Sequence, residues 1–272
     1  MRRGPLALVA AIGLVVIVAG AGAAGWWLTR PSGSAHARRV TVAAAADLRF
    51  ALDDLVAQFR RTRPDVDVAV SYGSSGTFFA QISNGAPFDL FLSADRSYPD
   101  RLVERGLARA GSQFTYAVGR IVLWVPDASP IDVAAVGLAA LDDDRVRHVA
   151  IANPEHAPYG RAAMAALESA GRLDRVRPRL VFGENVAQTL QFVQSGAADA
   201  GIVALSLALA PPIKEQGRFW EIPQNLYPAL EQGGAILVHA ADPAATEDLR
   251  RFLVSPDARA TLTRYGFAPP RP

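Results

Sequence analysis

Small and polar residues gather at four points where a predicted strand ends and a predicted helix begins. The first turn of a helix has backbone N–H groups without partners and a partial positive charge, so it favours an anion. Small side chains let a ligand approach the backbone, and a serine or tyrosine hydroxyl can add a hydrogen bond. We therefore predict a site for a small anion at these four points, which contain Asp47, Ser75, Tyr159 and the pair Asn185 and Val186.

Residues of these types also cap helices without binding any ligand. Ser, Asp or Asn before a helix accepts hydrogen bonds from its first N–H groups and stabilises it by about 1 kcal/mol. Asp47 is the clearest case, because its carboxylate would repel an anion. We expect that carboxylate to cap the following helix, with the backbone N–H of Asp47 as the donor to the ligand. Four similar junctions in one chain make capping alone a weaker explanation.

Other chemistry finds little support in the residues. The chain has no cysteine, and its four histidines show no paired ligand spacing, so we predict neither a metal site nor a cofactor. The motif Gly73-Ser-Ser-Gly76 is neither the serine-hydrolase elbow nor a phosphate-binding loop. The alternative is a secreted hydrolase with Ser74 or Ser75 as nucleophile, for which only His156 lies near a junction as a base.

An alternation of short apolar runs and amphipathic runs positions these junctions. Residues 66–70 show the pattern of a strand, and residues 50–60 have apolar side chains at helical spacing. Strands separated by helices imply βαβ crossovers and a mainly parallel sheet. The alternation occurs twice, which predicts an α/β protein with two lobes, each a mainly parallel sheet flanked by helices. We expect lobe 1 to contain residues 40–117 plus 234–272, and lobe 2 to contain residues 118–233.

The first 39 residues have the composition of an export signal. Two arginines precede an almost uncharged apolar run over residues 5–28, and a small-x-small pattern ends at Ala37. We expect a signal peptide that is cleaved there or, since the run is also long enough to span a bilayer, an N-terminal membrane anchor. Both interpretations place the folded part outside the cytoplasm, as in the periplasm.

The charge of the chain excludes one class of partner. The formal net charge is +2, and five arginines lie before residue 40, so the rest of the chain carries −3. Binding of nucleic acid needs clustered Lys and Arg to neutralise the phosphates. We therefore expect no nucleic-acid partner.

Several motifs occur in the order and at the separations typical of one known family. They are Val40-Thr-Val-Ala-Ala-Ala-Ala-Asp-Leu48, Tyr72-Gly-Ser-Ser-Gly-Thr77, Gly85-Ala-Pro-Phe-Asp-Leu-Phe-Leu-Ser-Ala-Asp95, Asn153-Pro-Glu-His-Ala-Pro-Tyr-Gly160, Gly201-Ile-Val203 and Arg264-Tyr-Gly-Phe267. With them the chain resembles, from about Val40 to Phe267, the molybdate-binding protein of bacterial ABC importers, the ModA family. The resemblance implies a type II periplasmic-binding-protein fold, whose two lobes close over molybdate or tungstate and deliver it to an ABC permease in the inner membrane. We also expect a monomer, without catalytic turnover.

The resemblance also assigns contacts to the oxygens of molybdate, residue by residue. The family's first binding serine falls on Asp47, where this chain departs from serine and keeps mainly the backbone N–H. The second falls on Ser75, a further contact falls on Tyr159, and a backbone donor falls on Val186 beside Asn185. No side chain is expected to ligate the metal directly.

One further position departs from the family pattern. The tyrosine that some members carry after Gly-Ile-Val falls on Ala204, a loss that Tyr159 or Ser206 would offset with its hydroxyl. The alternatives to molybdate are sulfate, phosphate or a small organic acid, the last held by an arginine clamp from Arg49 or Arg161. A rigid pocket of fixed dipoles can reject the smaller sulfate. It has little means of separating molybdate from tungstate, which are nearly equal in size and charge.

Overall fold

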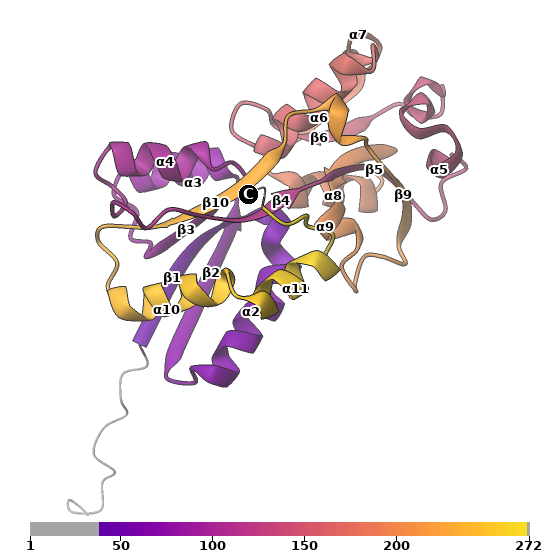
Figure 1. The fold of residues 1–272 in the computed structure, drawn as a ribbon. Coiled ribbons are helices and arrows are strands. Elements are labelled where there is room, and N and C mark those ends of the chain that lie inside the picture. Colours follow the sequence, from indigo (N-terminus) through magenta and orange to yellow (C-terminus); the bar gives the residue numbers. More distant parts are fainter. Residues whose placement is uncertain (1–37, 271–272) are drawn as a thin grey trace, which may run out of the picture. The chain divides into compact units, whose positions relative to one another are not determined.

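Two five-stranded sheets organise residues 38–270, the part of the chain that the computed structural model describes (Figure 1). The strand order of the first sheet is β2 (Val66–Gly73), β1 (Arg38–Ala45), β3 (Leu90–Ser93), β10 (Leu230–Ile236) and β4 (Phe114–Gly119). The strand order of the second sheet is β7 (Leu180–Gly183), β6 (Val149–Ala152), β8 (Ala200–Ala204), β5 (Ile121–Pro126) and β9 (Gly217–Glu221).

The two sheets share one pattern of strand directions. In each, three neighbouring strands are parallel, the next is antiparallel to them, and the outermost is antiparallel to that one. The antiparallel strands are β10 in the first sheet and β5 in the second. The predicted α/β class is therefore confirmed, with mixed sheets in which parallel strands prevail.

Helices flank both sheets because the buried strands have apolar side chains on both faces. Val40 and Val42 of β1 belong to the same apolar cluster as α2, whereas Ala43 points to the opposite cluster, which contains residues of α3 and α4. The helices around the first sheet are α2 (Arg49–Thr62), α3 (Ser75–Ser83), α4 (Ser97–Glu104), α10 (Pro243–Leu253) and α11 (Pro256–Arg264). Those around the second are α5 (Val133–Val136), α6 (Pro158–Ser169), α7 (Leu173–Val176), α8 (Val186–Gln194) and α9 (Leu205–Ala208).

The chain passes twice between the sheets. Only Arg120 separates β4 from β5, and the chain returns between β9 and β10. We call the first sheet with its helices lobe 1 and the second sheet with its helices lobe 2. The strands place residues 118–119 and 230–233 in the first sheet, so the crossings lie a few residues away from the expected lobe boundaries.

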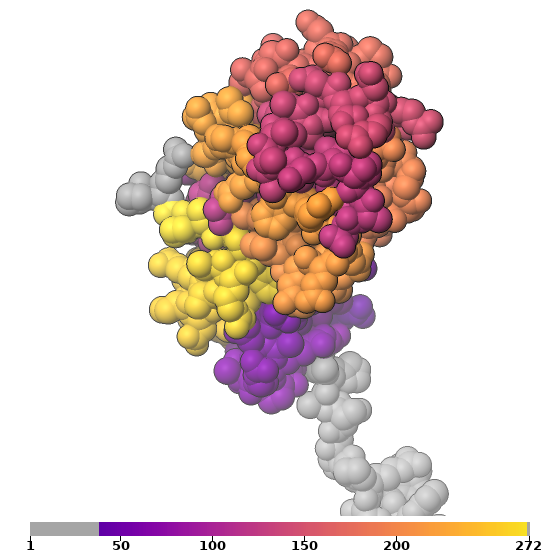
Figure 2. Space-filling model, turned by 90° about the vertical axis from the view of Figure 1, so that its right-hand side faces the viewer, coloured from indigo at the N-terminus to yellow at the C-terminus, as the bar shows by residue number. Residues whose placement is uncertain are grey.

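The C-terminal helices return to lobe 1. The ring of Phe252 in α10 lies 5.5 Å from that of Phe59 in α2, and the hydroxyl of Tyr265 donates to Asp54 at 2.7 Å. Figure 2 shows this yellow segment beside the indigo N-terminal part of lobe 1. The two ends of the described chain therefore build one lobe together.

The predicted leader, residues 1–39, lies outside the described residues except for Arg38 and Arg39, which already belong to β1. The side chain of Arg38 binds the carboxylate of Asp242 with two hydrogen bonds, of 2.5 and 2.7 Å. Within residues 38–270, none of the helices combines the length and the apolar character that crossing a bilayer requires.

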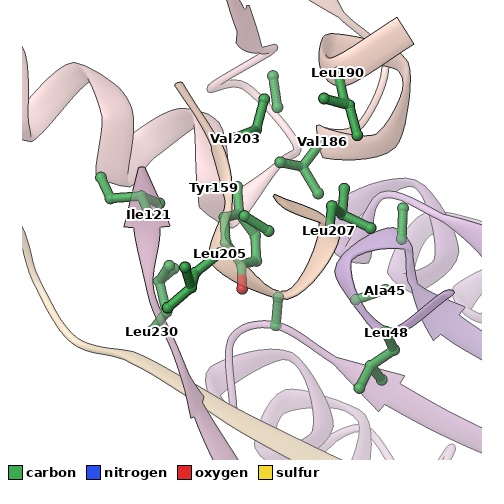
Figure 3. Close-up of a cluster of buried hydrophobic side chains, with 14 of the residues drawn as sticks. Ala45, Leu48, Ile121, Tyr159, Val186, Leu190, Val203, Leu205, Leu207 and Leu230 are labelled. Carbon is green, nitrogen blue, oxygen red and sulfur yellow. The ribbon is translucent and has the colours of Figure 1, made fainter. Parts of the chain in front are cut away.

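One apolar cluster continues from lobe 1 into lobe 2. Figure 3 shows where it crosses, with the ring of Tyr159 among Leu205, Leu207 and Val186. Tyr159 is 3% exposed, although it carries a polar group. The hydroxyl at its tip therefore needs hydrogen-bond partners inside the protein, and these partners belong to the candidate site.

Candidate functional site

The four predicted junctions meet at one small cavity between the lobes. Its lining includes every predicted residue, namely Asp47, Ser75, Tyr159, Asn185 and Val186. Lobe 1 contributes the ends of β1 and β2 and the start of α3, and lobe 2 contributes the starts of α6 and α8. The cavity measures about 10 Å³, far below the roughly 300–1,000 Å³ of pockets for drug-sized ligands. It leaves no room for an extended molecule.

Ser75 has two free donors at the start of α3. The residue is 1% exposed, and its Oγ accepts a hydrogen bond from the backbone N–H of Ala94 at 3.0 Å. Within residues 38–270, neither the hydroxyl nor the backbone N–H of Ser75 donates to an acceptor. Both donors are therefore available to an anion in the cavity.

The start of α8 is capped by Asn185. Its Oδ1 accepts hydrogen bonds from the backbone N–H groups of Ala187 at 3.0 Å and Gln188 at 3.1 Å. The N–H of Val186 lies in the same turn and has no acceptor among the described residues. The cap thus fixes the first turn and leaves Val186 as its free donor.

Asp47 does not cap the helix that follows it, and this corrects our prediction. The residue lies inside the 3-10 turn η1 (Ala46–Leu48) rather than before a helix, and neither η1 nor α2 has a side-chain cap. The carboxylate is instead buried, with an exposed fraction of 1%. Its Oδ2 accepts hydrogen bonds from the hydroxyl of Tyr159 at 3.0 Å and from Nε2 of Gln232 at 2.5 Å.

The other oxygen of Asp47 is unpaired. Oδ1 is buried and has no hydrogen-bond partner within residues 38–270. Burial disfavours the charged form and raises the pKa of Asp47 from 3.8 to about 6, although the bonds from Gln232 and Tyr159 act in the opposite direction. At neutral pH the site therefore contains a poorly solvated negative charge.

The hydroxyl of Tyr159 is directed at Asp47. It also accepts a hydrogen bond from Nε2 of Gln232 at 3.2 Å. Gly119 makes this approach possible, since a Cβ there would lie 2.3 Å from the hydroxyl. Burial and the charge of Asp47 raise the pKa of Tyr159 well above its ordinary value, so the phenol stays neutral. Its single proton is donated within the protein, to the carboxylate of Asp47.

Sequence reasoning missed two residues of this network. Gln232 in β10 is fully buried, and its Oε1 lies 3.0 Å from the hydroxyl of Tyr116 in β4. The Tyr116 hydroxyl also lies 3.1 Å from the carbonyl oxygen of Ser93. A glutamine close to an apolar run is the signal that could have pointed to this network. The apolar pattern, however, predicts neither β4 nor the part of β10 before Gly234.

Hydrogen bonds next to the cavity join the lobes. The carbonyl oxygen of His156 in lobe 2 accepts from the backbone N–H of Gly76 at 2.9 Å and from Oγ of Ser74 at 2.5 Å. A Cβ at Gly76 would lie 2.6 Å from that oxygen, so the contact requires glycine. Arg161 of lobe 2 and Asp95 of lobe 1 form an ion pair with an N–O distance of 2.7 Å.

The two hydroxyls expected to replace the missing tyrosine at Ala204 have different places. Ala204 is fully buried and does not line the cavity. The hydroxyl of Ser206 donates to the backbone oxygen of Asp47 at 2.7 Å, so Ser206 supports the turn rather than the cavity. Of the two, Tyr159 alone belongs to the cavity lining.

The described part of the chain does not have the geometry of a serine hydrolase, a metal site or an arginine clamp. Ser74 contacts the backbone of His156, whose ring Nε2 lies 3.0 Å from Oε2 of Glu184, so neither serine is paired with a histidine base. Residues 38–270 contain no group of three or more side chains that could hold a metal ion. Arg49 is exposed and Arg161 is held in its ion pair, so neither supplies a free cation to the cavity.

Comparison with known proteins finds relatives along nearly the whole described chain. The sequence model of the family described as "Bacterial extracellular solute-binding protein" matches residues 40–268. The molybdate-binding protein ModA of Rhodobacter capsulatus is 39% identical over 233 residues, which cover 86% of this chain and 89% of that protein. The molybdate-binding protein ModA of Azotobacter vinelandii is 39% identical over 234 residues, which cover 86% and 91%, respectively.

The fold agrees with that of a solved relative. The structure of the Azotobacter vinelandii periplasmic molybdate-binding protein matches with a TM-score of 0.80 and 35% identity, covering 85% of this chain and 100% of that one. This match confirms the two-lobed type II binding-protein fold that the motifs predicted. By family match, identity and fold, this chain belongs to the bacterial extracellular solute-binding proteins and, within them, to the ModA family.

Proposed function

We propose that this chain is the extracytoplasmic binding component of an ABC importer, which captures molybdate between its lobes and delivers it to a permease in the inner membrane. One observation carries the proposal: the free donors of Ser75 and Val186, from different lobes, line the same small cavity. The kinship with molybdate-binding proteins supports the choice of cargo. Tungstate, nearly equal in size and charge, is expected to bind as well.

The manner of binding follows from the donors. The N-terminal turns of α3 and α8 present neutral N–H groups with partial positive charge, and Ser75 adds a hydroxyl. These groups would contact the oxygens of the ion, without direct ligands to the metal. Sulfate is smaller, so its oxygens would lie beyond good hydrogen-bond distance from donors fixed by two lobes.

The remaining parts of the proposal concern location and partners. We place the folded part in the periplasm, reached through an export signal in residues 1–39. We expect a monomer without catalytic turnover, a cofactor or a nucleic-acid partner. An organic acid is the less favoured cargo, because Arg161 is engaged by Asp95 and the cavity is small.

Calorimetric titration of the purified protein with molybdate, tungstate, sulfate and phosphate tests this function. We expect tight binding of the first two and weak or no binding of the others. Ser75→Ala should weaken molybdate binding roughly 10- to 100-fold, because a hydrogen bond to a charged group contributes about 1.5–3 kcal/mol.

Ser83→Ala is the matched control, since Ser83 lies at the other end of α3 and outside the cavity. It should bind molybdate as the wild-type protein does. Failure of the wild-type protein to bind any of the four anions would contradict the proposed function. Equal affinities of the two serine variants would remove Ser75 from the site.

A further inference from the structure

A carboxylate in a cavity for an anion is the unexplained feature of this site. Asp47 lines the cavity together with Ser75 and Val186. Its Oδ1 is buried and unpaired among residues 38–270. A doubly charged oxyanion bound in this cavity would lie close to this carboxylate. Repulsion between them is strong in a buried site, because little water is present to screen it.

No neighbouring charge cancels this repulsion. In the described part of the chain, no arginine, lysine or histidine forms a hydrogen bond or an ion pair with Asp47. The groups that face it are all neutral: Tyr159 from α6, Gln232 from β10, Tyr116 from β4 behind Gln232, Ser206 from α9 on the backbone oxygen, Ser75 from α3 and Asn185 from α8.

The hydrogen bonds also hold the carboxylate in place. Oδ2 accepts from both Tyr159 and Gln232, and Gln232 is itself in contact with Tyr116. Rotation of the carboxylate away from the cavity would leave these buried donors unpaired, which is costly. Removal of the charge is the remaining way to admit a dianion.

We propose that Asp47 takes up a proton on Oδ1 when the oxyanion enters, so that capture of one dianion is coupled to uptake of one proton. The proton comes from solvent and forms an O–H bond at Oδ1, which makes the side chain neutral. The new hydroxyl then donates a hydrogen bond to an oxygen of the anion. This inference rests on the proposed function and names a further determinant of binding at the same site.

The acidity of Asp47 places this coupling in the neutral pH range. Its pKa of about 6 without ligand means that the carboxylate is ionised at pH 7.5, and a dianion beside it raises the pKa further. A group whose pKa rises on binding favours binding at low pH. Affinity for the anion should therefore fall above about pH 6, by roughly tenfold per pH unit, until the pH exceeds the pKa in the complex.

The test is calorimetric titration of the full chain with molybdate at about pH 7.5, in several buffers that differ in ionisation enthalpy. The slope of the measured heat against buffer enthalpy gives the number of protons taken up, and we expect close to one. Repeating the titration between about pH 6 and 8 should show the loss of affinity. In Asp47→Asn, proton uptake and pH dependence should both disappear.

Asp53→Asn is the matched control. Asp53 carries a carboxylate on α2, bound to the hydroxyl of Tyr72 at 2.6 Å and outside the cavity, so this variant should still take up one proton. Wild-type binding without proton uptake would overturn the inference and leave the proposed function intact, and so would a pH dependence that persists in Asp47→Asn. Absence of any molybdate binding would overturn both. The wild-type titration decides the matter even if Asp47→Asn does not fold.

Discussion

Burial of a carboxylate without a counter-charge destabilises a folded protein, and at Asp47 this effect depends on pH. The pKa of Asp47 rises from 3.8 to about 6 on folding, chiefly through burial. Because the pKa is raised on folding, folding favours the protonated form of Asp47. The contribution of this protonated side chain to stability is complete below about pH 4 and is lost as the pH rises through 6. Because one pKa unit corresponds to about 1.4 kcal/mol, the ionised form costs about 3 kcal/mol at neutral pH.

Asp47→Asn should therefore unfold less readily than the wild-type protein at neutral pH, by about 2–3 kcal/mol, and this difference should vanish near pH 4. The amide keeps an oxygen that can accept the bonds from Tyr159 and Gln232. Denaturant unfolding of both proteins without oxyanion, between about pH 4 and 8, measures the effect. Other carboxylates titrate alike in both proteins and cancel. A difference that stays constant with pH would show that Asp47 is not perturbed.

The site residues predicted from local pattern line one cavity, but local pattern does not predict how they are connected. Ser75, Asn185 and Val186 act at the first turn of their own helix, so a few neighbouring residues define them. The partners of Asp47 lie far away in sequence, at separations of 112 residues for Tyr159 and 185 for Gln232. Only the folded chain shows that its carboxylate binds these two side chains rather than the helix.

The same distinction holds for the elements. The helix α2 lies close to the predicted residues 50–60 because its apolar face repeats at helical spacing. The sequence pattern does not predict β4, because a single residue separates it from β5 and no helix marks its boundary. In β10 the pair Gly233 and Gly234 weakens the strand pattern, although these glycines are needed for close packing against Arg96 and Phe114.

The cap of α8 is expected to contribute both to the stability of the protein and to molybdate binding. Asn185→Ala removes the acceptor for Ala187 and Gln188 and should destabilise the protein by about 1 kcal/mol. It should also weaken molybdate binding, because the donor Val186 lies in the turn that loosens. Denaturant unfolding and calorimetry measure the two effects.

Ser255→Ala provides the comparison for that variant. Ser255 caps α11 through the N–H of Ala258 at 3.3 Å, away from the cavity. It should lower stability to a similar extent and leave the affinity unchanged. If both variants bind molybdate equally well, the first turn of α8 takes no part in binding.

At the scale of the whole described chain, the site exists only while the lobes are in contact. Ser75 comes from lobe 1 and Val186 from lobe 2, and neither lobe alone encloses the cavity. The contacts that hold the lobes together include the apolar cluster around Tyr159, the hydrogen bonds to Asp47, the carbonyl of His156 and the ion pair of Arg161. The ion pair is partly exposed and is expected to contribute little. The contact between Gly76 and His156 leaves no space for a side chain.

Gly76→Ala should therefore weaken the contact between the lobes without destabilising lobe 1. The added Cβ would meet the carbonyl oxygen of His156 at 2.6 Å, a distance that real Cβ atoms essentially never show. Within α3 itself alanine favours the helix by up to about 1 kcal/mol over glycine, so the lobe should remain stable. We expect molybdate affinity to fall at least tenfold, which corresponds to about 1.4 kcal/mol, with little change in unfolding. Gln81→Ala, on the exposed face of the same helix, should change neither quantity. Equal affinities of the two variants would mean that the lobes bind the ion without this contact.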